Sequence, residues 1–196
     1  MPEIWAIILA AGESTRMGTN KLLLPFNGKP IISVVIDNVM QSDVDHILVV
    51  LGAFRDEMLP LIEEMPVKHC YNPDYKQGML SSVQCGFRNM PDTMDAAMIF
   101  LGDQPMIPGD LANRIIKEYQ KSKIGMLIPV CNGKRGHPVL IDKKYKYDIE
   151  KLDPAEGLRA LFYRPNKDIQ EVEVEATGIL RDIDTFQDYR NETNLK

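Results

Sequence analysis

Three continuous apolar runs, each followed by a polar loop, limit the folds that this chain can adopt. They span residues 4–9, 46–51 and 96–101. A strand that is apolar at every position has both faces covered, which is typical of parallel sheets with helices on each side. Helix-like segments separate these runs. The pattern therefore predicts an α/β fold, a three-layer sandwich with a mostly parallel, Rossmann-like sheet.

The remaining segments extend this pattern along the chain. We expect helices over 30–41, 55–64, 79–89 and 111–121, another starting at Asp153-Pro154, and a short one after Thr185; further strands are expected over 67–71, 126–129, 138–141 and, at a sheet edge, 170–174. Asp before Pro suits a helix start because Asp caps free N–H groups and Pro has none to satisfy. Closer strand spacing over 132–184 indicates a small β-rich insertion on the same domain. We see no long linker in the sequence, so a single domain over residues 1–196 is expected.

Composition excludes several classes of protein. A formal net charge of −5 argues against broad binding to a phosphate backbone, so we expect no nucleic-acid partner. The three cysteines include no Cys-x-x-Cys pair, which favours reduced thiols and a cytoplasmic location. The N-terminal apolar run is far shorter than the ~20 residues of a membrane span, and no basic segment precedes it. We therefore expect no membrane segment and no secretion signal.

The loop after the first apolar run has the composition of a phosphate-binding loop. Small residues at positions 10–12 let backbone N–H groups approach a phosphate closely, and successive loop amides can form a concave anion site. Arg16 and Lys21 add positive charge that can neutralise a leaving pyrophosphate. The loop matches neither the Walker A pattern nor Gly-x-Gly-x-x-Gly. The alternative is an ordinary glycine-containing turn with exposed basic residues.

Asp103 is a candidate metal ligand because it directly follows the third apolar run. Magnesium in proteins commonly takes one or two carboxylates together with substrate phosphates, and a carboxylate at a strand end can hold it against triphosphate oxygens. The alternative is an Asp that forms a turn before Pro105.

Two more polar segments are candidates for ligand contacts. Gly78 precedes a predicted helix whose N-terminus offers free N–H groups, and Ser81 or Ser82 could bond a base or ribose or simply cap the helix. The loop 132–138 contains two basic residues, two glycines and His137, which suits an anionic acceptor. His137 could also be a packed histidine or a general base. Acceptor contact is favoured, because an acceptor phosphate is already an anionic nucleophile.

Residues 9–21, Leu-Ala-Ala-Gly-x-Ser-x-Arg-Met-Gly-x-x-Lys, resemble the signature of nucleotidyltransferases related to molybdenum cofactor guanylyl- and cytidylyltransferases. Residues 22–25 and 28–30 continue the similarity, and Gly-Asp-Gln-Pro at 102–105 resembles the family's metal-binding motif. In that family the loop backbone holds the triphosphate, and the final Lys contacts phosphate. The resemblance implies catalytic roles for Arg16, Lys21 and Asp103. It implies nucleotide contacts by Leu9, Ala10, Ala11, Gly12, Arg16, Lys21, Gly78, Ser81, Ser82 and Asp103.

A second carboxylate is assigned by the same resemblance. Residues 182–185 are similar to the start of the family's Asp-x-Asp-Thr-Pro-Glu-Asp segment, so Asp103 and Asp184 are the expected Mg²⁺ ligands and Asp182 is a close candidate. Alternate residues of an extended segment face opposite ways, so we expect only one of the two to bind the metal directly. An Asp that caps the last helix is the alternative. The chain has Phe186-Gln187 where the family has Pro-Glu, which weakens the expected start of the last helix.

The resemblance implies a single nucleotidyltransferase domain that transfers CMP from CTP to the phosphate of molybdopterin cofactor and releases pyrophosphate. Ala11 is typical of the cytidylyl branch, and residues 133–138 resemble that branch's Gly-x-Arg-Gly-His-Pro, which assigns acceptor contacts to Arg135, Gly136 and His137. A molybdenum enzyme is a candidate client. The alternatives are guanylyl or other nucleotidyl transfer to a sugar or alcohol phosphate, and a non-catalytic accessory protein. Two metal carboxylates favour catalysis.

Overall fold

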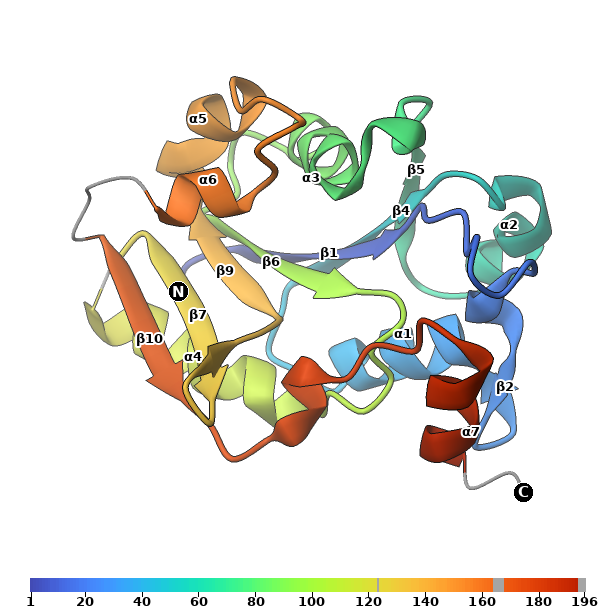
Figure 1. Ribbon diagram of the computed structural model, residues 1–196. Coiled ribbons are helices and arrows are strands. Elements are labelled where there is room, and N and C mark those ends of the chain that lie inside the picture. Colours follow the sequence, from blue (N-terminus) through green and yellow to red (C-terminus); the bar gives the residue numbers. More distant parts are fainter. Residues whose placement is uncertain (123, 164–167, 194–196) are drawn as a thin grey trace.

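A mixed sheet forms the middle layer of the computed structural model, which describes residues 1–122, 124–163 and 168–193 (Figure 1). Its strands are β1 (Ile4–Ala10), β4 (His46–Leu51), β5 (Lys68–Tyr71), β6 (Ala96–Leu101), β7 (Met126–Cys131), β8 (Lys134–Arg135), β9 (Val139–Asp142) and β10 (Ile169–Glu173). They lie in the order β10-β7-β9-β6-β1-β4-β5, with β8 paired to β7. All pairs are parallel except those made by β8 and β9. The predicted mostly parallel sheet is confirmed.

Helices cover both faces of this sheet. They are α1 (Ile31–Met40), α2 (Arg55–Glu63), α3 (Met79–Arg88), α4 (Gly109–Ser122), α5 (Lys146–Glu150), α6 (Arg159–Phe162) and α7 (Phe186–Thr193). Single 3-10 turns are η1 (Lys21–Leu23), η2 (Tyr75–Gln77), η3 (Lys143–Tyr145) and η4 (Thr177–Leu180), and β2 (Pro25–Phe26) pairs with β3 (Lys29–Pro30). In Figure 1, α3, α5 and α6 lie above the sheet, and α1 and α4 lie below it.

The continuous apolar runs are explained by two separate cores. Along β1, Ala6 and Ile8 belong to the core between the sheet and helices α1 and α4, whereas Trp5 and Ile7 belong to the core between the sheet and helices α3 and α5. The side chains of β4 and β6 are divided in the same way. Because successive residues of a strand point to opposite faces, a strand between two cores must be apolar at every position.

The order of the strands places a ligand site at one point of the sheet. From β1 the chain passes to β4 and then β5 on one side, after which β6 returns to the other side of β1. This reversal next to β1 is a topological switch point, where α/β proteins bind ligands at the carboxyl ends of the strands. The loops that leave β1 and β6 flank it, and they carry the predicted phosphate loop and Asp103.

One predicted helix start is wrong. Asp153-Pro154 begins a turn, and α6 begins only at Arg159. Asp153 Oδ1 accepts the N–H of Ala155, and its carbonyl accepts the N–H groups of Glu156 and Gly157. Gly157 then adopts a φ of 70°, which ends the turn. The local bonds of Asp153 therefore close a turn instead of starting a longer helix.

The other predicted helices and strands are confirmed to within two residues at their ends. The strands in the 132–184 region join the main sheet: β9 lies between β6 and β7, and β10 forms an edge next to β7. Of the helices in the described residues, none has both the length and the apolar character needed to cross a membrane.

Candidate active site

A cavity of about 410 Å³ lies at the carboxyl ends of β1 and β6. Its walls are formed by Leu9, Ala11, Gly12, Glu13, Ser14, Thr15, Arg16, Lys21, Leu22, Tyr75, Lys76, Gly78, Met79, Ser82, Leu101, Asp103 and Asp184. Every residue with a predicted nucleotide contact lines it except Ala10 and Ser81. Segments that are distant in sequence thus meet where the strand order reverses.

The loop 11–20 forms the cavity wall next to β1. Ser14 has a φ of 47°, and its carbonyl accepts the N–H groups of Met17 and Gly18, which closes a turn. The Met17 side chain is buried and anchors the loop in the core below. Among the described residues, no acceptor takes a hydrogen bond from the backbone N–H groups of residues 12–16. These amides can therefore bind an anion.

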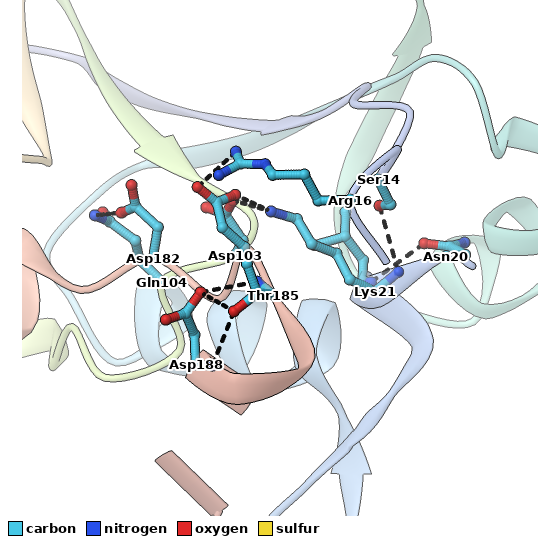
Figure 2. A network of polar contacts seen from close by, with 11 residues as sticks. Ser14, Arg16, Asn20, Lys21, Asp103, Gln104, Asp182, Thr185 and Asp188 are labelled. Carbon is cyan, nitrogen blue, oxygen red and sulfur yellow. Dashed lines mark hydrogen bonds and ion pairs between the residues drawn. The ribbon is translucent and has the colours of Figure 1, made fainter. Parts of the chain in front are cut away.

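Lys21 is the centre of a network of opposite charges. Its Nζ lies 2.5 Å from Asp103 Oδ2 and 2.8 Å from Asp184 Oδ1. Arg16 Nη2 lies 2.7 Å from the other oxygen of Asp184. Figure 2 shows the side chains of Arg16 and Lys21 extending toward the carboxylate of Asp103. The side chain of Lys21 is only 12% exposed, so its contacts are poorly screened by water.

These contacts shift the pKa values of the network. Burial lowers the pKa of Lys21, but the charge of Asp103 and hydrogen bonds to Asp103 and Asp184 outweigh burial and raise it. Burial raises the pKa of Asp184, but Lys21 and Arg16 outweigh burial and hold it below its usual value. At neutral pH, Lys21 is therefore cationic and Asp184 anionic.

Asp182 has a different environment from Asp184. Gln104 Nε2 donates to its Oδ1 at 2.5 Å, and Asp182 does not line the cavity. Burial, followed by repulsion from Asp103, raises its pKa. The backbone N–H of Ile183 bonds the carbonyl of Asp103, so the two acidic segments are joined directly. Figure 2 shows Asp182 turned toward Gln104.

The segment after Asp184 is fixed by a capping box at the start of α7. The N–H and hydroxyl of Thr185 bond Asp188 Oδ2, and the N–H of Asp188 bonds Thr185 Oγ1 in return. Tyr189 then bonds the carbonyl of Pro25 at 2.5 Å. The expectation of a weakened helix start is wrong, because Thr185 and Asp188 supply reciprocal caps without a proline.

The N-terminus of α3 forms the opposite wall of the cavity. Gly78, with a φ of 96°, turns the chain into the helix, and no side chain in the described part of the chain caps this helix end. Ser82 lines the cavity, whereas Ser81 is bonded inside the loop. Sequence reasoning missed Tyr75, Lys76 and Met79 in this wall. Their position in the polar loop before Gly78 was the available signal.

The predicted acceptor loop is not brought into this cavity. Arg135 Nε bonds Glu171 Oε1 at 2.7 Å, and the N–H of Gly136 bonds the carbonyl of Pro129. Burial lowers the pKa of His137 to about 4, so this side chain is neutral at pH 7. A side chain at Gly136 would collide with Ile179 of η4, three residues before Asp182. The loop thus packs against the segment that leads to the acidic residues.

Asp103 and Asp184 fit a divalent cation. Both contact one ammonium, so their carboxylates converge on a position where positive charge already sits. Within the described part of the chain, no cluster of three or more His, Cys, Asp or Glu side chains could hold a metal ion. A cation on these two residues would take its other ligands from water or from a phosphorylated substrate, which is usual for Mg²⁺.

The fold and the cavity together define an α/β protein with a potential anion site, made of free loop amides and basic side chains, at the switch point of the sheet. Residues 6–170 match the MobA-like NTP transferase domain, and the chain belongs to this family.

Two relatives and one solved structure illustrate this similarity. The chain is 30% identical to the molybdenum cofactor cytidylyltransferase of Escherichia coli K12, over 96% of this chain and 95% of that protein. It is 29% identical to the purine catabolism protein PucB of Bacillus subtilis 168, over 96% and 95%. Its fold resembles the crystal structure of Rv0371c from Mycobacterium tuberculosis H37Rv with a TM-score of 0.89, at 22% identity over 99% and 98% of the two chains.

Proposed function

We propose that this protein is a Mg²⁺-dependent cytidylyltransferase that transfers CMP from CTP to the phosphate of a molybdopterin-type acceptor and releases pyrophosphate. One observation carries the proposal: Lys21 joins Asp103 and Asp184 in the same cavity that the unbonded loop amides line. This combination provides an anion site and a cation site within reach of one triphosphate. An accessory protein that only bound a nucleotide would not need both carboxylates.

The reaction needs no covalent intermediate on the protein. An oxygen of the acceptor phosphate attacks the α-phosphorus, and the bond from that phosphorus to the oxygen bridging to the β-phosphate breaks. The electron pair leaves with pyrophosphate. Mg²⁺ held by Asp103 and Asp184 would neutralise triphosphate oxygens and polarise the α-phosphate. The chain's own groups orient the reactants and stabilise the departing charge.

The loop N–H groups, Arg16 and Lys21 each have a separate role in this reaction. The N–H groups of residues 12–16 bind the triphosphate, and Arg16 and Lys21 neutralise the negative charge that grows on the leaving group. When a triphosphate and a cation enter, Lys21 exchanges part of its contact with the carboxylates for contact with phosphate. The network among Arg16, Lys21, Asp103 and Asp184 thus keeps the site neutralised before substrate binds.

The choice of base and acceptor rests on the cytidylyltransferase relative and on Ala11. The relative is named for cytidylyl transfer to molybdenum cofactor, and it aligns with this chain over nearly its whole length. Ala11 lines the cavity at the position where Gly-Gly is more usual in guanylyl members. Gly136 packs against Ile179 of η4, three residues before Asp182, and the proposal keeps the acceptor contacts in this loop, at Arg135, Gly136 and His137.

The test is pyrophosphate release with Mg²⁺ and molybdopterin cofactor, with CTP, GTP, ATP and UTP supplied in turn. Release with CTP alone is expected. Release with GTP alone would keep the mechanism and replace the cytidylyl assignment by a guanylyl one. Binding of a triphosphate without release, with this acceptor and with sugar phosphates, would favour an accessory protein.

A further inference from the structure

Asn72 is a buried polar side chain with a fixed orientation. It is 2% exposed and lies at the end of β5, outside the cavity wall. Its backbone N–H bonds the carbonyl of Leu51, and its Oδ1 accepts the backbone N–H of Asp74 at 3.0 Å. Because an amide oxygen must face that N–H, the Nδ2 group must face the other way.

The Nδ2 group of Asn72 donates to two neighbouring hydroxyls on α3. It lies 2.9 Å from Ser81 Oγ and 3.0 Å from Ser82 Oγ. One hydrogen is available for each contact, so both serine oxygens act as acceptors toward Asn72. Each hydroxyl then keeps its own hydrogen for a different partner.

The two serines differ in where that hydrogen can go. Ser81 Oγ lies 2.9 Å from the carbonyl of Asp74 and 2.8 Å from that of Gly78, so its hydrogen is used inside the loop. Ser82 lines the cavity, and no other described residue offers its Oγ an acceptor. The hydrogen of Ser82 is therefore left to point into the cavity.

We propose that Asn72 is a positioning residue that makes Ser82 a hydrogen-bond donor toward the bound nucleotide, and that Ser81 has only a structural role. This inference rests on the proposed function and names the atom type that the nucleotide presents at this wall. That atom is an acceptor: a carbonyl oxygen or ring nitrogen of the base, or a ribose oxygen. If the base presented only an N–H group at this wall, that donor would meet only other donors, the Ser82 hydroxyl and the N–H groups at the start of α3, and would have no acceptor.

The decisive variant is Asn72→Asp, which keeps the shape but replaces the donor by an acceptor. One carboxylate oxygen can still accept the N–H of Asp74, whereas the other draws the hydroxyl hydrogen of Ser82 away from the cavity. We expect the dissociation constant for Mg²⁺-CTP, measured by calorimetry without acceptor, to rise about tenfold. Ser82→Ala removes the same donor and should weaken binding about fivefold to tenfold.

A double-mutant cycle separates this role from the charge that Asn72→Asp adds. In the Ser82→Ala background, Asn72→Asp has no donor left to remove, so its remaining effect reports only the new charge and should be about twofold. Ser81→Ala should lower the unfolding temperature more than Ser82→Ala and weaken nucleotide binding less. Ser33→Ala is the matched control, because Ser33 is a buried serine on α1, outside the cavity, and its Oγ has no hydrogen-bond partner among the described residues.

The outcomes are distinct. If the effects of the Asn72 and Ser82 substitutions on CTP binding are equal and additive, Asn72 does not position Ser82. If the native protein binds CTP and Ser82→Ala binds it equally well, Ser82 is not a donor to the nucleotide. A native protein that bound none of the four triphosphates would overturn the proposed function as well. If Asn72→Asp failed to fold, Ser82→Thr, which keeps the hydroxyl, should bind as the native protein does and Ser82→Ala should not. Repeating the comparison with 2′-deoxy-CTP tests whether the acceptor is the ribose 2′-oxygen, since Ser82→Ala would then no longer weaken binding.

Discussion

The loop 11–20, together with the adjoining Lys21, and the loop 132–138 both combine glycines with basic residues, yet they differ in whether these groups face the cavity. The first has a row of backbone N–H groups that bond no acceptor among the described residues, and Arg16 and Lys21 line the cavity, where they pair with Asp184 and Asp103. In the second, Arg135 is paired with Glu171 and the N–H of Gly136 bonds Pro129. His137 in that loop is neutral at pH 7. The first loop therefore presents free backbone amides and basic side chains to the cavity, whereas these groups of the second loop are bonded or buried within the fold.

Composition therefore identifies a binding loop only where the folded chain leaves backbone N–H groups without acceptors and turns the basic side chains toward a cavity. A bonded backbone group must give up its partner before it can bind a ligand, whereas Arg16 and Lys21 can meet a ligand in the same cavity as the carboxylates that pair with them. We therefore expect substitutions around the first loop to have large effects on nucleotide binding and turnover, and substitutions in the second loop to act on the fold and the acceptor and to leave nucleotide binding nearly unchanged.

The largest effect should come from Asp103→Asn. This change keeps the shape of the side chain but removes the charge that pairs with Lys21 at the cavity. We expect pyrophosphate release to fall by roughly a thousandfold or more, because the cation would lose one of two protein carboxylates. Circular dichroism should show an unchanged fold. Native, Mg²⁺-dependent turnover by the Asp103→Asn variant would remove the central role of this residue.

The next comparison is between Asp184→Asn and Asp182→Asn. Asp184 faces the cavity, whereas Asp182 is bonded to Gln104 and turned away. The first change should lower turnover by about a hundredfold and raise the Mg²⁺ concentration needed for half-maximal activity. The second should stay within about tenfold and leave the Mg²⁺ requirement unchanged. The opposite ranking would exchange the two assignments.

Much of the fold and of the cavity could be predicted from sequence because the signals are local. Continuous apolar runs mark strands between two cores, and in a parallel sheet the loops after such strands meet at one edge. Lys21 and Asp103 lie in the segments that follow β1 and β6, so the rule places both at the same edge of the sheet. The Thr185–Asp188 capping box also has a local signature, Thr-x-x-Asp, although its strength was underestimated.

What could not be predicted depends on distant partners. Ser81 and Ser82 are adjacent and chemically identical, and only the orientation of Asn72 and the carbonyls around Gly78 distinguish their hydrogens. The pairing of Arg135 with Glu171 likewise requires β8 and β10 to lie on the two sides of β7 in one sheet. Such contacts form only when the whole sheet is assembled, so no local pattern reports them.

Lys21→Ala should separate anion binding from cation binding in the first loop. The dissociation constant for triphosphate should rise about thirtyfold to a hundredfold, because a charge-assisted contact to phosphate is lost. Mg²⁺ affinity in the absence of nucleotide should stay the same or increase, because Asp103 and Asp184 lose the ammonium that competes for them. Both constants can be measured by calorimetry. Unchanged triphosphate binding would mean that the loop amides suffice.

The smallest effect should be found at His137, in the loop that has used its polar groups within the fold. Burial lowers its folded-state pKa to about 4 from an ordinary value of 6.5. Between these two pH values the unfolded chain binds a proton that the folded chain does not, so the free energy of unfolding should fall as the pH decreases from 6.5 toward 4. We expect a loss of roughly 2–3 kcal/mol from this residue between pH 7 and pH 4.5.

His137→Gln tests this last step, because glutamine has no charge in either state. Urea unfolding of the native and variant proteins at pH 7 and pH 4.5 gives the loss of stability for each, and the variant should lose less. The pKa values of Asp95 and Asp168 are held below their ordinary value in the folded protein, and because both residues are present in both chains their contributions cancel in the comparison. Equal losses would mean that the pKa of His137 is not lowered in the folded protein. The imidazole of His137 would then be hydrated in the folded protein, and burial of this side chain would no longer distinguish the loop 132–138 from the loop 11–20.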